Sequence, residues 1–205
     1  MATIGVFYLS MDVMQKDSKV SLDSQASVYA QEGIEAVRNI RDSDWLLGAS
    51  FNGTAGRTKN NVWGSELPQA NGETRYYTVD FNQPSSLPVS SSLNLAAAAP
   101  WKLGALSVDE VKKGVKTLLY KQENVLLREI HYTHSVTRLR TRNSITQVTP
   151  FHRYIVISPV EYPLCRLQGP RCFKKMRVAS VVEWQEFGQT KQVRLDTELT
   201  DWKDN

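Results

Sequence analysis

Residues 30–45 read AQEGIEAVRNIRDSDW, and this stretch decides how the rest of the chain is interpreted. Small and apolar side chains recur there at intervals of three and four residues, which is the spacing of one face of an α-helix. The residues on that face are Ala26, Ala30, Gly33, Ile34, Val37 and Ile40. Glu35 precedes Arg38 by three residues, which favours an ion pair along the helix surface. The stretch therefore predicts an amphipathic helix.

The helical segment extends well ahead of this stretch. Neither a proline nor a turn dipeptide occurs between Thr3 and Arg41, and one continuous helix of that length would be roughly 60 Å long. The alternative is a second helix that starts between Asp17 and Asp23. The helix is expected to stop at RDSDW, because aspartate and serine favour local turn hydrogen bonds over a helix interior. The predicted sheet-facing residues are Ala30, Ile34, Val37, Ile40 and Trp45.

Most of the remaining chain has the pattern of β-strands. RYYTVDF at 75–81, FHRYIVISPV at 151–160, KMRVASVVEW at 175–184 and TKQVRLDTELTDW at 190–202 are predicted strands, with a turn at Gly188. Residues 117–134 are expected to form two strands joined by a turn at KQEN. SVDEVKKGVK predicts a short helix capped by Ser107.

Strands that follow a helix without βαβ alternation indicate an α+β fold, here one long N-terminal helix packed on an antiparallel sheet. The expected division is a helix at 1–47 and a β-rich head at 48–205. An irregular connection rich in serine, proline and alanine is expected at about 84–106. At 205 residues the chain is long enough for one well-packed domain.

The two ends of the chain resemble the bacterial type IV pilin-like proteins, in particular minor pilins and pseudopilins. The resemblance lies in AQEGIEAVRNIRDSDWL and in the closing hairpin RVASVVEWQEFGQTKQVRLDTELTDW, and it covers about 25–47 and 149–202. HYTHS and TPFHRYIVI are similar to central strands of that family.

This resemblance implies a structural subunit, expected to be a minor one, of a type IV pilus or a type II secretion-like pseudopilus. The implied partners are other pilin subunits, and the implied location is the cell surface after anchoring in the inner membrane. The chain departs from the family at its front, because no basic leader, prepilin glycine or glutamate-bearing apolar spine is present. The sequence is therefore expected to lack the cleavage and methylation segment and to start inside the spine.

The two cysteines, Cys165 and Cys172, lie in one short segment, CRLQGPRC. The segment spans a turn between stretches that have the pattern of paired strands, so a disulfide is favoured. A pair of reduced thiols without a role is the alternative.

Three alternating arginines, Arg138, Arg140 and Arg142, would share one face of an extended segment. Such a basic row can hold phosphates, so the alternative function is a soluble or tip-located adhesin or polyanion-binding module, with nucleic acid as the partner. The structural interpretation is a charged edge that discourages aggregation. The formal charge of +4 permits a polyanion partner without requiring one.

No enzymatic activity is expected, because no nucleophile elbow, P-loop or dinucleotide motif occurs. His131 and His134 are three residues apart, which on a strand places them on opposite faces and argues against a shared metal ion. No cofactor, metal or small-molecule substrate is therefore expected.

Overall fold

The computed structural model describes residues 2–46, 74–81, 101–114, 116–124, 129–134, 144–160 and 175–200. Within the N-terminal helix, side chains are described from Val20 to Asp42. The elements in chain order are α1 (Ala2–Leu46), β1 (Arg75–Phe81), β2 (Trp101–Leu106), α2 (Val108–Lys112), β3 (Leu118–Asn124), β4 (Glu129–Thr133), β5 (Ser144–Pro159), β6 (Lys175–Glu186) and β7 (Gln189–Thr200).

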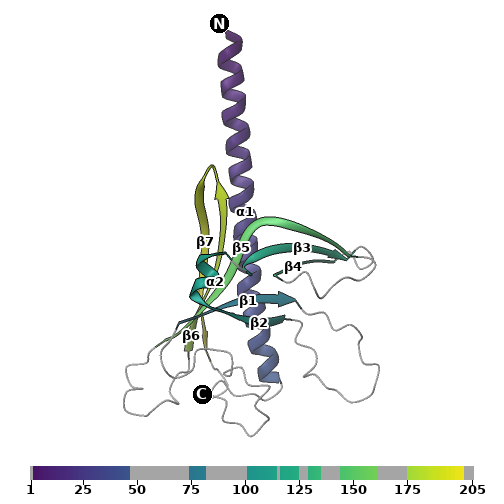
Figure 1. Ribbon diagram of the computed structural model, residues 1–205, viewed down its shortest axis with the longest axis vertical. Helices are drawn as coiled ribbons and strands as arrows, with labels where there is room; N and C mark the ends of the chain where they lie inside the picture. Colours follow the sequence, from purple (N-terminus) through teal and green to yellow (C-terminus); the bar gives the residue numbers. More distant parts are fainter. Residues whose placement is uncertain are drawn as a thin grey trace.

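The strands form one antiparallel sheet in which β5 is the central element (Figure 1). Along one path the strand order is β2-β1-β5-β3-β4. From β5 the sheet also extends through β6, which pairs with β5, to β7, which pairs with β6. The C-terminal part of β5 lies between β1 and β6, whereas its N-terminal part pairs with β3. A register shift between Leu118 and Tyr120 bends β3 along this partner. One long strand thus joins two subsheets.

The predicted fold class, α+β with a long helix packed on the sheet, is wrong. Of the residues with described side chains, 59% are in strands, and the helix contributes 23 of them, from Val20 to Asp42. The strand content is higher than expected because the strands extend beyond the segments in which polar and apolar residues alternate. β5 starts at Ser144, seven residues ahead of the predicted strand, and KQEN belongs to β3 instead of forming a turn.

Several local predictions differ from the structure in their bounds. The helix contains no break near Asp17, and it continues through RDSDW to Leu46, so the predicted stop signal does not end it. The segment expected to be irregular, 84–106, ends in strand β2, which pairs with β1 over six residues. The predicted strand at 75–81 and the predicted short helix capped by Ser107, which is α2, are confirmed, and Glu110 completes a capping box with Ser107.

Two apolar clusters hold α1 against one face of the sheet. The first lies under the C-terminal part of the described helix and contains Ile34, Ala36, Val37, Tyr77, Val79, Ile155, Ile157, Met176, Val178 and Leu199. The second lies toward the N-terminus and contains Ala26, Tyr29, Ala30, Leu119, Phe151, Val182 and Trp184. Side chains of β5 alternate, so that Phe151 and Ile155 face the helix while Tyr154 and Val156 face away.

The hairpin of β6 and β7 is regular over its whole length. Its strands pair without a register shift from Lys175 opposite Thr200 to Glu186 opposite Gln189. The turn residues, Phe187 and Gly188, have φ values of 48° and 77°. Positive φ at both central residues matches the twist of a two-residue hairpin, and glycine adopts it without strain.

Candidate functional site

The predicted helix–sheet contact residues lie where α1 meets the sheet. Ala30 and Val37 are fully buried, Ile34 is 6% exposed, and Ile40 packs at the margin of the first apolar cluster. Trp45 belongs to α1, but its side chain is outside the described part of the helix. These positions fall on one stripe because 3.6 residues complete a helical turn.

Helix and sheet approach each other closely at Gly33. A Cβ atom built on this glycine would lie 2.4 Å from Ser180 Oγ and 3.0 Å from Ile155 Cδ1. The missing side chain therefore allows the helix backbone to rest directly on β6. Ala30 and Ala26, about one and two turns before it, keep the same stripe small.

A buried arginine joins the helix to the sheet between the two apolar clusters. Arg153 on β5 is fully buried, and its Nη1 donates to Glu32 Oε2 at 3.0 Å and to the Tyr29 carbonyl at 3.2 Å. Its Nη2 donates to the carbonyl oxygens of Val79 and Tyr132, both at 3.4 Å. Burial lowers the pKa of Arg153, and the nearby Glu32 carboxylate opposes that shift. The guanidinium thus connects α1, β1, β4 and β5.

A second buried polar group extends this connection toward the other end of the sheet. His134 Nδ1 lies 2.9 Å from the Val79 carbonyl oxygen, and Nε2 lies 2.9 Å from that of Arg153. The His134 backbone N–H donates to Asp80 Oδ1 at 2.8 Å, and Thr133 Oγ1 donates to the same oxygen at 3.0 Å. The segment after β4 is therefore fixed to β1.

The pKa values of His134 and Asp80 are shifted by their surroundings. Burial lowers the pKa of His134, against the opposing effect of the hydrogen bond to Asp80. Burial alone would raise the pKa of Asp80, but the interactions with His134 and Thr133 outweigh it and lower that pKa. Both ring nitrogens of His134 face carbonyl oxygens, so the neutral ring donates to one of them and the protonated ring to both, while burial favours the neutral form.

Sequence reasoning missed this polar network, although one signal was present. In FHRYIVI, Arg153 has the same strand parity as Phe151 and Ile155, which places it on the apolar face. A charged residue at such a position needs a counter-charge, and Glu32 supplies it from the helix at a distance of 121 residues along the chain.

The opposite face of the sheet carries a smaller apolar cluster bordered by charges. Val156, Ala179 and Val181 are buried there, with Tyr76 and Tyr154 packed against them and their rings 6.2 Å apart. The Tyr154 hydroxyl donates to Glu183 Oε1 at 2.9 Å. Burial, with this hydrogen bond, raises the pKa of Tyr154, so the phenol stays protonated.

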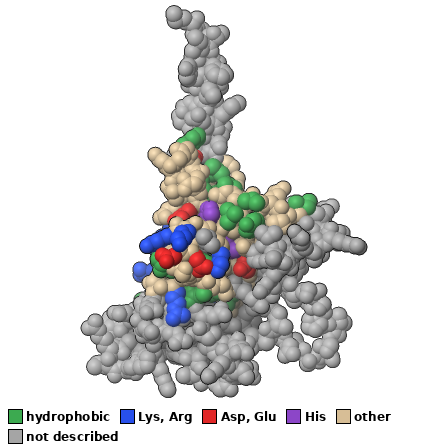
Figure 2. Space-filling model, in the orientation of Figure 1, with side chains coloured by type: hydrophobic (Ala, Val, Ile, Leu, Met, Phe, Trp, Pro, Cys, Tyr) green, Lys and Arg blue, Asp and Glu red, His purple; other side chains and the backbone are tan. Residues whose placement is uncertain are grey.

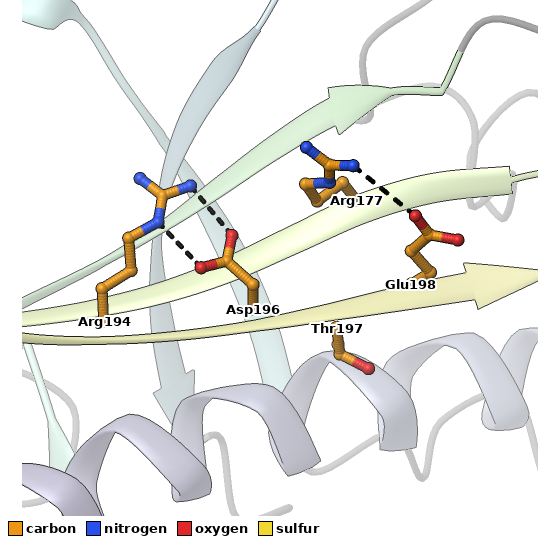
Figure 3. Close-up of a pocket in the computed structure, with 5 residues that line it drawn as sticks. All are labelled: Arg177, Arg194, Asp196, Thr197 and Glu198. Carbon is orange, nitrogen blue, oxygen red and sulfur yellow. Dashed lines mark hydrogen bonds and ion pairs between the residues drawn. The ribbon is translucent and has the colours of Figure 1, made fainter.

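Next to this cluster, the end of the β6–β7 hairpin forms a shallow hollow of about 550 Å³ (Figure 3). It is lined by Arg177, Arg194, Asp196, Thr197 and Glu198. Arg194 donates to both carboxylate oxygens of Asp196 at 2.9 Å, and Arg177 lies 3.6 Å from Glu198. These four side chains project away from α1, whereas Thr197 points toward it and accepts a hydrogen bond from Arg38 at 3.1 Å.

The described surface in Figure 2 has basic and acidic side chains interspersed and shows no large basic area. The predicted polyanion-binding residues, Arg138, Arg140 and Arg142, lie outside the described residues, and so do Cys165 and Cys172. The basic row and the disulfide therefore remain predictions. Among the described residues, no group of three or more histidine, cysteine, aspartate or glutamate side chains could hold a metal ion.

Comparisons with protein-family models, with curated proteins and with solved structures gave no match. Within the part of the chain that the structure describes, no helix is both long enough and apolar enough to cross a membrane.

Proposed function

We propose that the protein is a structural subunit, present as a minor component, of a type IV pilus or a related secretion pseudopilus. It would assemble through the N-terminal helix, with the β-rich head on the outside and other pilin subunits as partners. Anchoring in the inner membrane before assembly and location on the cell surface afterwards belong to the same proposal.

The observation that supports the proposal most directly is the position of α1. The helix passes the sheet and continues beyond it toward the N-terminus (Figure 1). At the start of the segment with described side chains, Val20 is 64% exposed, and Val28 on the same side of the helix is 62% exposed. Two exposed valines eight residues apart offer apolar surface to a neighbouring helix.

A subunit that is held by its helix needs a firm connection between helix and head. Gly33 against Ser180 removes the space between them, and Arg153 adds a charged hydrogen bond to Glu32 across the interface. Breaking such a buried pair is costly, so the head is expected to follow the helix as one body.

The test is to follow the product of the complete gene in its native cell. Surface filaments are sheared off, and the sheared, membrane and cytoplasmic fractions are probed with an antibody against the head. The expected result is protein in the membrane and sheared fractions, with loss of the sheared signal when the prepilin peptidase gene is deleted. Protein found only in the cytoplasm would contradict the proposal.

A further inference from the structure

Strand β7 has one edge without a strand neighbour among the described residues. It pairs with β6 on one side, and no other described strand adds to it. The strand has 12 residues, contains neither proline nor glycine, and keeps its register with β6 throughout. Edges of sheets are usually protected by proline, by bulges or by charged side chains; β7 has no proline or bulge, and its four charged residues, Lys191, Arg194, Asp196 and Glu198, are of both signs.

The hollow of Figure 3 follows this strand. Asp196, Thr197 and Glu198 are consecutive and therefore alternate between the two faces of the sheet, yet all three line the hollow. Arg177, Arg194, Asp196 and Glu198 line it with side chains that project away from α1, so the hollow lies over the outer face of β6 and β7. Arg194, Asp196 and Glu198 are exposed on that face, so this side of the edge strand is accessible to another extended segment.

The sequence of β7 is complementary to itself when it is reversed. A twofold axis perpendicular to a sheet requires one residue to lie opposite its own copy. With Leu195 at that position, Arg194 lies opposite Asp196 of the second copy, and Gln192 lies opposite Glu198. Centring on Arg194 or on Asp196 sets like charges against each other, and centring on Thr197 sets Asp196 opposite Glu198. Centring on Val193 brings no like charges together, but it leaves Arg194 and Asp196 without an opposite charge across the axis.

The side chain of Leu195, at the proposed twofold axis, is also accessible to a second copy. Leu195 has the parity of Thr197 and Leu199, which face α1, yet it is 37% exposed. Two copies of Leu195 would cover each other beside the two helices. Arg194 and Asp196 are each almost half exposed and lie on the other face, where two copies would form a network of four charges.

We propose that β7 pairs antiparallel with β7 of a second copy of this chain, with Leu195 at the twofold axis, so that the two sheets become one. The two α1 helices then lie on the same face and run in opposite directions. A polar filament needs helices that run in the same direction, so this dimer is a state of the free subunit. The inference therefore goes beyond the proposed function and does not rest on it.

The first experiment measures the mass of the isolated full chain by sedimentation equilibrium across the micromolar range. The expected result is a concentration-dependent dimer of the 23.2 kDa chain. Asp196→Arg places arginines opposite each other and should weaken dimerisation by about tenfold or more. The double change Arg194→Asp with Asp196→Arg restores opposite charges and should restore the dimer.

The matched control is Arg177→Asp. It reverses a charge on the same face and disturbs a comparable pair with Glu198, but it lies on β6, one strand in from the edge. This variant should dimerise like the parent chain, and far-UV circular dichroism should show that every variant is folded. A folded chain that stays monomeric, or a folded double variant that stays monomeric, overturns the proposal.

The second experiment tests the register. With Cys165 and Cys172 changed to serine, Leu195→Cys places two thiols opposite each other, where Cα atoms are about 4.5–5.5 Å apart, a spacing that a disulfide spans. Gln192→Cys places its two thiols about 20 Å apart along the strands. Mild oxidation should link the first variant and not the second, and equal linkage of both overturns the proposed register.

Discussion

Arg153 of β5 and Glu32 of α1 form an ion pair of 3.0 Å in which the guanidinium is fully buried and the carboxylate is about one quarter exposed. The pair lies where the two apolar clusters meet, so it interrupts the apolar contact between helix and sheet. A buried arginine costs desolvation energy, which the carboxylate and three backbone carbonyl oxygens offset. The pair therefore contributes more to the placement of the helix than to net stability.

Removing the carboxylate alone should be strongly destabilising. Glu32→Gln leaves the buried Arg153 guanidinium without its ion-pair partner, with only the more distant Asp80 carboxylate as a counter-charge, and the free energy of unfolding should fall by about 3 kcal/mol. Urea denaturation followed by circular dichroism measures this. The control is Glu35→Gln, which removes the exposed partner of Arg38 on the same helix and should cost less than about 1 kcal/mol. Equal effects of the two changes would show that the buried pair has no special role.

Adding one methyl group at Gly33 should separate helix and sheet. In Gly33→Ala the new Cβ would lie 2.4 Å from Ser180 Oγ and 3.2 Å from Ser180 Cβ, so the Ser180 side chain must rotate or β6 and α1 must move apart. Overpacking of this kind costs about 1–3 kcal/mol, which outweighs the gain of up to about 1 kcal/mol of alanine over glycine in a helix. Ser27→Ala, on the exposed side of the same helix, serves as the comparison and should be nearly neutral. The midpoint temperature of thermal unfolding measures the effect of each of the two substitutions. A Gly33→Ala protein as stable as the parent would mean that the contact is loose.

The buried His134 should make stability depend on pH. Burial lowers its pKa below the ordinary value of 6.5, so below that pH the unfolded chain takes up a proton that the folded chain resists. The free energy of unfolding should therefore fall as pH is lowered from 7.5 to 5.5, by at most about 1.4 kcal/mol per pH unit. Urea titrations at several pH values measure the slope.

The variant His134→Gln isolates this contribution, because the other two histidines are retained. Between pH 7.5 and 5.5, the free energy of unfolding of this variant should change less steeply with pH than that of the parent chain. Asp80 also stabilises the fold, because its pKa is lower in the folded chain. This contribution is lost only when the pH falls below 3.8, the ordinary pKa of aspartate, so it stays constant between pH 7.5 and 5.5. Identical slopes for parent and variant would contradict the assignment.

Charge on the exposed side of α1 should affect assembly and leave folding unchanged. Val28→Glu introduces a carboxylate at a position that is 62% exposed in the subunit and, in the proposed filament, faces another helix. The free energy of unfolding should change by less than about 0.5 kcal/mol, while the amount recovered in sheared filaments falls at least about tenfold. Val148→Glu on β5, where the valine is 70% exposed on the head, provides the matched control and should assemble normally.

The sequence predicted the local elements better than their arrangement. The helical stripe from Ala26 to Ile40 and the strand at 75–81 depend on short-range periodicity, which can be read directly from the sequence. The predicted end of the helix at RDSDW was wrong, because turn-favouring side chains on a helix surface do not break it by themselves.

The site residues divide in the same way. The apolar stripe is visible in the spacing, but the Arg153–Glu32 pair needs a sheet register that sets β5 under α1, and no local pattern encodes a contact across 121 residues. The strand parity of Arg153 could have marked it as buried, and nothing in the sequence identified its partner. The free edge of β7 likewise follows from the order of strands in the sheet.

The hydrogen bond from Arg38 to Thr197 spans 159 residues, and the helix meets its main contacts on β5, β6 and β7 only in the last third of the chain. During synthesis at about 5–20 residues per second, the apolar stripe of α1 therefore waits on the order of ten seconds or more for its sheet. Contacts this distant in sequence also slow spontaneous folding. The apolar stripe of α1 thus stays without its sheet on the nascent chain until the final hairpin has left the ribosome.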